Sequence, residues 1–112
     1  MNALLIRPGE KIEETDVEFT KEFLNEFFGE VETGAYVLGY LNLCVYFITN
    51  PTSKPANFTL FDIPFFGNVL ITGIKPNGEP CSLAYEDGAF IRRYINACKQ
   101  QVKAPKKRGC KI

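Results

Sequence analysis

The sequence predicts a single α+β domain: a mainly antiparallel sheet of about five strands, one short helix, and a longer C-terminal helix on one face. Three stretches carry this prediction: an apolar run at 41–49, a hairpin pattern at 68–83 and a helical apolar stripe after residue 86. A chain of 112 residues can fold around one hydrophobic core without metals or disulfides. We expect the domain to span residues 1–102, and residues 103–112 to form a basic, flexible tail.

The first third of the chain predicts two strands and a short helix. Residues 3–6 are an apolar run that ends at a Pro-Gly turn signal. Residues 11–18 alternate weakly among acidic side chains, which is typical of an exposed edge strand that charge protects from aggregation. Thr20 has the position of an N-cap for a helix at 21–28, and Gly29 can end that helix in a left-handed conformation.

The middle of the chain predicts the strands of the core. Residues 41–49 are apolar on both alternating faces, so we expect a central strand that is covered on both sides. Residues 50–57 are rich in Pro, Asn and Ser and indicate a loop. Within 68–83, Asn77-Gly78 separates two strand-like runs, and this pair is favoured where both central residues of a tight turn need positive φ.

The last predicted element is a helix from about residue 86 to residue 101. Glu86 and Asp87 suit its positive end, and Lys99 suits its negative end. Its apolar stripe packs it against the sheet and comprises Phe90, Ile91, Tyr94, Ile95, Cys98 and Val102.

The segment 58–67 is unusually aromatic for a connection that contains a proline. Two interpretations stay open. The phenylalanines fold back on the core as a compact surface loop, or they form an exposed anchor for a partner, since aromatic residues concentrate binding energy at interfaces. The candidate partner-binding residues are Phe58, Phe61, Phe65 and Phe66.

Charge divides the chain although its formal net charge is zero. Residues 1–32 hold nine acidic and three basic side chains, whereas residues 92–112 hold eight basic and no acidic ones. Such a basic end can steer an anionic partner, or it can be a solvated helix face with a solubilising tail. The candidate residues for binding an anion or nucleic acid are Arg92, Arg93, Lys99, Lys103, Lys106, Lys107 and Arg108.

The composition argues against catalysis. Histidine is absent, which removes the usual general base near neutral pH, the commonest metal ligand and any Ser-His or Cys-His pair. The four cysteines have neither zinc-site nor CxxC spacing, and no glycine-rich phosphate loop occurs. We therefore expect a protein that is not an enzyme and that uses no cofactor and no metal.

The sequence also predicts a compartment. No apolar run approaches the roughly 18–20 residues that a membrane-spanning helix needs, and the amino-terminal residues lack the pattern of a signal peptide. The cysteines suit reduced thiols in a cytosol, with Cys110 in the basic tail as the thiol most open to oxidation. We expect a cytoplasmic protein without membrane contact.

Three short motifs occur together: residues 3–9, the segment from Asp62 to Gly73, and Ser82-Leu83 before the last helix. Across residues 3–100 the chain resembles a family of small uncharacterised proteins carried by bacteriophages, plasmids and integrative elements. Members often carry a Pro-x-Asn-Arg-like segment, and here Phe58 replaces the arginine after Pro55-Ala56-Asn57, which puts any role of that arginine in doubt. The resemblance implies residence in a mobile element of a bacterial host and supplies no activity.

Three functions compete on this basis. The favoured one is a stoichiometric inhibitor or sequestering binder that acts on a host defence or regulatory protein through the aromatic segment or a sheet edge. The second is a nucleic-acid-binding accessory protein that uses the basic helix and tail. The third is a sponge for a small anionic nucleotide, held by Arg92 or Arg93 with a Tyr or Phe stacked on the base. The sequence does not predict an oligomeric state.

Overall fold

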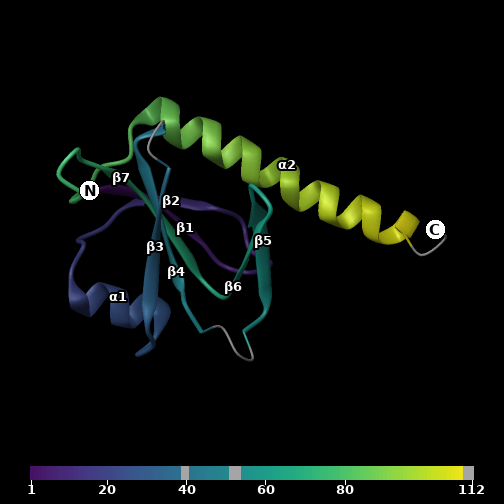
Figure 1. Ribbon diagram of the computed structural model, residues 1–112, viewed down its shortest axis with the longest axis horizontal. Helices are drawn as coiled ribbons and strands as arrows, with labels where there is room; N and C mark the ends of the chain where they lie inside the picture. The colour runs from purple at the N-terminus through teal and green to yellow at the C-terminus, as the bar shows by residue number, and fades with distance from the viewer. Residues whose placement is uncertain (39–40, 51–53, 110–112) are drawn as a thin grey trace.

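The computed structural model describes residues 1–38, 41–50 and 54–109, with side-chain environments up to Cys98. Five strands form the main path of an antiparallel sheet in the order β2-β1-β7-β4-β3, and the short β8 pairs with β7 (Figure 1). These strands are β1 (Asn2–Ile6), β2 (Glu13–Asp16), β3 (Thr33–Leu38), β4 (Leu43–Ile48), β7 (Val69–Ile74) and β8 (Pro80–Cys81). The remaining elements are the hairpin of β5 (Ala56–Leu60) and β6 (Ile63–Phe66), and the helices α1 (Lys21–Phe28) and α2 (Tyr85–Gly109). The predicted α+β class is confirmed.

The two helices cover opposite faces of the sheet. On one face, α2 and the β5-β6 hairpin bury a core that includes Leu4, Val45, Ile71 and Ile91, each 0% exposed. On the other face, α1 buries a smaller core with Phe27, Phe28 and Leu70. In Figure 1, α2 crosses one end of the sheet and its C-terminal half extends past the β5-β6 hairpin.

The ends of α1 have the predicted chemistry. The Thr20 hydroxyl accepts a hydrogen bond from the Phe23 N–H (3.1 Å), which satisfies one of the free amides of the first turn. Gly29 ends the helix at φ 87°, and its N–H donates to the Asn25 carbonyl (2.8 Å). A helix of eight residues has little stability alone, so its packing on the sheet holds it in place.

The predicted hairpin at β7-β8 is present, but its turn differs from the prediction. Gly78 has φ 90°, whereas Asn77 does not have positive φ. The Gly78 N–H donates to the Lys75 carbonyl (2.9 Å), and the Lys75 N–H donates to the Glu79 carbonyl (2.8 Å). This is a longer loop built on a type I turn, because Pro76 is suited to its second position and Gly78 alone supplies the left-handed residue.

The predicted central strand is confirmed as β4, which lies between β7 and β3 with both faces covered, although it starts at Leu43 and not at residue 41. Two further predictions need correction. The aromatic segment is a hairpin and not a loop, because Phe61 (φ 49°) and Asp62 (φ 67°) both adopt the left-handed conformation of a type I′ turn. The backbone of α2 continues past the predicted helix end at residue 101 to Gly109.

Candidate functional site

The four predicted aromatic contacts have different environments. Phe58 and Phe65 are buried (5% and 4% exposed), with ring centroids 5.4 Å apart, so they belong to the core and not to a binding surface. Phe61 is partly buried against the core, and Phe66 is 37% exposed. Burial thus leaves Phe61 and Phe66 as the members of this set that reach the surface. The cause is the hairpin, which turns alternate side chains toward the sheet.

The hairpin turn also brings together aromatic rings that are distant in the sequence. The rings of Phe61 and Tyr94 stack at 5.1 Å and 30°, and those of Tyr94 and Phe90 at 6.4 Å and 13°. We call Phe61, Tyr94 and Phe90 the aromatic row. Partial burial raises the pKa of Tyr94, and the neighbouring Cys98 raises it further. The outer ring of the row, Phe90, is 47% exposed, so one flank of α2 presents an aromatic surface.

The predicted basic residues also have different environments. The Arg92 guanidinium lies 2.8 Å from a Glu14 carboxylate oxygen of β2 and is therefore already paired with an anion of this chain. Arg93 is exposed on the same helix. The side chains of Lys99, Lys103, Lys106, Lys107 and Arg108 lie outside the described ones.

Two of the polar side chains around a depression between α1 and the sheet, Arg7 and Asn68, are held by contacts within the fold. This depression of about 170 Å³ is lined by Leu5, Arg7, Phe23, Glu26, Phe27 and Asn68. The Arg7 guanidinium lies 2.8 Å from Glu13 and 5.2 Å from the ring centre of Phe27. The Asn68 amide donates to the Phe27 carbonyl (2.7 Å). These contacts attach α1 to the sheet.

The described thiols and acids form no cluster that could hold a metal ion. Burial raises the pKa of the Cys44 thiol, and a thiol that keeps its proton is a poor nucleophile. Among the residues that the structure describes, no group of three or more His, Cys, Asp and Glu side chains could hold a metal ion. In the same part of the chain, no helix is long and apolar enough to cross a membrane.

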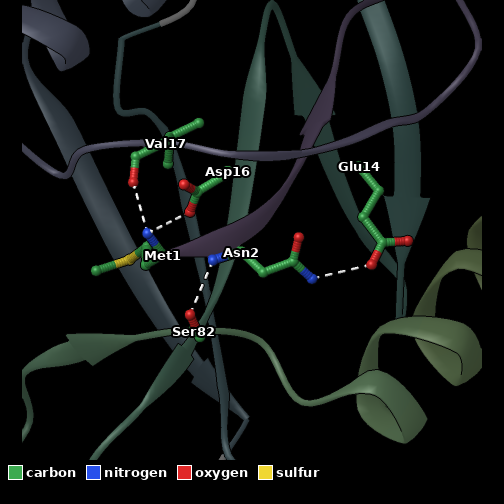
Figure 2. Close-up of polar contacts among 6 residues, drawn as sticks. All are labelled: Met1, Asn2, Glu14, Asp16, Val17 and Ser82. Atoms are coloured by element: carbon green, nitrogen blue, oxygen red, sulfur yellow. Dashed lines mark hydrogen bonds and ion pairs between the residues drawn. The ribbon is translucent and has the colours of Figure 1, made fainter.

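The edge formed by β2 is closed by charge. Three of its four residues are acidic, and each carboxylate has a cationic partner: Glu13 pairs with Arg7, Glu14 with Arg92, and Asp16 with the Met1 amino group at 2.7 Å. Figure 2 shows the last of these, together with the hydrogen bond from the Asn2 amide to Glu14 (2.9 Å). An added strand would have to approach a row of acids that the fold holds in place.

The edge formed by β3 has the opposite character. The strand carries no charged residue, and in the described part of the chain it pairs with β4 alone. Val31, Tyr36 and Val37 are 42%, 38% and 51% exposed, so half of the six large apolar side chains that are exposed among the described residues lie in or near this strand. Exposed apolar residues along a free sheet edge are a recognised site for strand addition.

The register shows which backbone groups of β3 are free. The Thr49 N–H donates to the Glu32 carbonyl (3.1 Å), so the alternation of an antiparallel ladder directs Gly34, Tyr36 and Leu38 toward β4. The Ile74 N–H donates to the Asn42 carbonyl (3.1 Å), so the even-numbered residues of β4 bond to β7 and its odd-numbered residues bond to β3. This agrees with the pairing of Gly34, Tyr36 and Leu38. The N–H and C=O groups of Thr33, Ala35 and Val37 therefore point away from the sheet.

The sequence interpretation named a sheet edge as one possible contact and did not identify which edge. A signal was present, since residues 33–50 contain no charge and residues 10–18 are rich in acids. What the sequence does not reveal is that these two segments lie at opposite edges of one sheet.

Comparison of the chain with protein-family models, curated proteins and solved structures found no match.

Proposed function

We propose that this chain is a non-enzymatic binding protein that captures an extended segment of a host protein along the free edge of β3. The observation that carries the proposal is the uncharged edge with the outward backbone groups of Thr33, Ala35 and Val37. Backbone hydrogen bonds to an added strand supply affinity, and side chains on alternate faces supply specificity. Tyr36 and Val37 are exposed on opposite faces and suit this second role.

In this proposal the chain is an accessory protein of a bacteriophage, plasmid or other mobile element, and it works in the bacterial cytoplasm. It inhibits or sequesters a defence or regulatory protein in a stoichiometric complex. Support comes from the sequence resemblance and from the absence of histidine, which leaves binding as the simpler activity. Because the edge is uncharged, such a complex withstands moderate salt better than one built on surface ion pairs.

The test is affinity capture from the bacterial host with mass spectrometry, using wild type and two variants. Ala35→Pro removes an outward N–H that β4 does not use, so the fold survives and the complex is lost. Thr15→Lys is the matched control, because it changes the β2 edge and leaves β3 intact. We expect a stoichiometric partner with wild type and Thr15→Lys, and none with Ala35→Pro. Capture that Ala35→Pro leaves unchanged would remove β3 from the proposal.

A second candidate function, binding of a nucleotide or a single-stranded nucleic acid, is favoured by the aromatic row. Phe90 offers a half-exposed ring for a base, and Arg93 follows it on the helix with an exposed cation for a phosphate. Base stacking on an aromatic side chain contributes about 1–3 kcal/mol per base.

Titration with a fluorescent mononucleotide and a single-stranded oligonucleotide at two salt concentrations tests this candidate. Phe90→Ala and Arg93→Ala should each weaken binding, whereas Arg92→Ala, whose side chain pairs with Glu14, should change it less. Oligonucleotide affinity should fall steeply as salt rises. Binding that both variants leave intact excludes the aromatic row as the site.

A further inference from the structure

We infer that a second copy of this chain occupies the β3 edge when no other partner is present, by antiparallel pairing of β3 with itself about a two-fold axis at Ala35. The inference rests on the proposed function, since it concerns the same strand-accepting edge. It adds the occupant and the register. The host partner then competes with the second copy for the edge.

The free backbone groups determine which registers are possible. Thr33, Ala35 and Val37 point outward, so an antiparallel partner must place residues of this set opposite one another. The register centred on Ala35 uses all three residues: Thr33 faces Val37 of the second copy, Ala35 faces Ala35, and Val37 faces Thr33. Each of these pairs exchanges two hydrogen bonds, which gives about six across the interface. A register centred on Thr33 or Val37 leaves part of this set unpaired.

Side-chain size favours the same register. Gly34 faces Tyr36 of the second copy, so the cross-strand partner of each tyrosine has no side chain that obstructs it. Within one chain, Thr49 and Phe47 flank Gly34, because a Cβ at Gly34 would lie 2.9 Å from Thr49 Cγ2 and 3.1 Å from the Phe47 ring. The tyrosine of the second copy would extend this aromatic contact. On the opposite face, Val37 and Thr33 form a β-branched cross-strand pair.

Charge permits this pairing at β3 and opposes it at β2. In the antiparallel arrangement, Glu32 of each copy faces Leu38 of the other, so the two glutamates lie at opposite ends of the interface. Self-pairing of β2 would instead bring together Glu13, Glu14 and Asp16 of two copies. Like charges directly opposite one another destabilise a strand pair, so the same chain can dimerise at one edge and not at the other.

Charge complementation at Ala35 is the decisive experiment. The exposed Ala35 tolerates a longer side chain, and the two-fold axis places both copies of residue 35 in direct opposition. Light scattering should give twice the 12.6 kDa chain mass for wild type and for the control Thr15→Lys. Ala35→Lys and Ala35→Glu alone should each give the monomer mass, and their mixture should return to the dimer. Circular dichroism verifies that each variant is folded.

Cysteine cross-linking measures the register. With Cys81, Cys98 and Cys110 replaced by serine, Ala35→Cys should form a disulfide-linked dimer, since paired Cα atoms lie about 5.5 Å apart. Val37→Cys alone should not, because the Cα atoms of the two copies of residue 37 are roughly 14–15 Å apart in this register. Mixing Thr33→Cys with Val37→Cys should restore the cross-link. Cross-linking of Val37→Cys to itself would overturn the register.

The outcomes separate this inference from the proposed function. A wild-type chain of monomer mass, or a mixture of Ala35→Lys and Ala35→Glu that stays monomeric, overturns the inference. If Ala35→Pro still abolishes capture of the host protein in that case, β3 remains the binding edge. A dimer with the predicted cross-links, combined with capture that Ala35→Pro does not affect, supports the inference and refutes the role of β3 in capture.

Discussion

The two edges of the sheet present similar backbone geometry and opposite chemistry. At β2, each acidic side chain pairs with a cation of the same chain. At β3, uncharged side chains leave the outward groups of Thr33, Ala35 and Val37 accessible. The difference indicates that one edge is protected and the other is available. An edge without such protection is open to strand addition.

The largest expected loss of stability comes from removing the Phe65 ring, which packs against Phe47 next to β3. Phe65 contacts Phe47 (5.3 Å between ring centres), and Phe47 lies over Gly34 of β3. Phe65→Ala should lower the free energy of unfolding by about 3–5 kcal/mol, because it leaves a cavity in a buried aromatic cluster. Phe66→Ala, which truncates a neighbour that is 37% exposed, should cost less than about 1 kcal/mol. Urea denaturation compares the two variants, and equal losses would contradict the assignment of Phe65 to the core.

A pair of proline substitutions tests the direction of the backbone groups in β3. Tyr36→Pro removes an N–H that bonds to β4 and should cost about 3 kcal/mol. Ala35→Pro removes an N–H that points outward, so we expect a loss of about 1 kcal/mol or less. Thermal and urea denaturation give the comparison. If Ala35→Pro proved the more destabilising of the two, the parity of the ladder would be wrong.

High pH should weaken the β3 side of the sheet. Tyr46 pairs with Ala35 in the ladder between β3 and β4. Burial, and to a lesser extent the neighbouring Cys44, raise the pKa of Tyr46 to about 12. The folded chain holds the proton of the Tyr46 phenol more tightly than the unfolded chain does. The protonated phenol therefore stabilises the fold fully below the unfolded pKa near 10, and this stabilisation is lost as the pH rises toward 12. We expect a loss on the order of 1 kcal/mol, since the phenol is partly solvated.

Tyr46→Phe provides the comparison for this titration. Urea denaturation between about pH 8 and about pH 11 should show a shallower decline for the variant than for wild type. Burial also raises the pKa of Cys44, and a hydrogen bond with Tyr46 lowers it, so wild type and variant are compared in a Cys44→Ala background that removes this second titrating group. Parallel profiles would show that the Tyr46 phenol is not the group responsible.

The smallest effect is expected at the protected edge. The Arg92 and Glu14 side chains are 44% and 31% exposed, so Arg92→Ala should cost about 0.2–1 kcal/mol, and salt should reduce the difference.

Replacing Glu13, Glu14 and Asp16 together with threonine removes the charge that protects β2. This triple variant should form assemblies larger than a dimer, which light scattering detects. Unchanged association would show that charge is not what closes β2.

Local sequence determined the elements and the chemistry of their surfaces. Alternating and helical apolar patterns predicted β1, β2, β4, β7, α1 and α2, and the caps at Thr20 and Gly29 agree with the structure. The acidic character of residues 11–18 predicted a charged edge, which β2 is. These features depend on neighbouring residues along the chain, so they can be predicted without knowledge of the fold.

Tertiary structure alone decided which of these surfaces remain accessible. The left-handed turn at Phe61-Asp62 buried Phe58 and Phe65 and aligned Phe61 with Tyr94 and Phe90. Strand order placed β7 in the middle of the sheet and left β3 with one neighbour in the described chain. Pairing between distant segments sets both outcomes, because burial and edge position depend on which strands meet and not on the composition of any one strand.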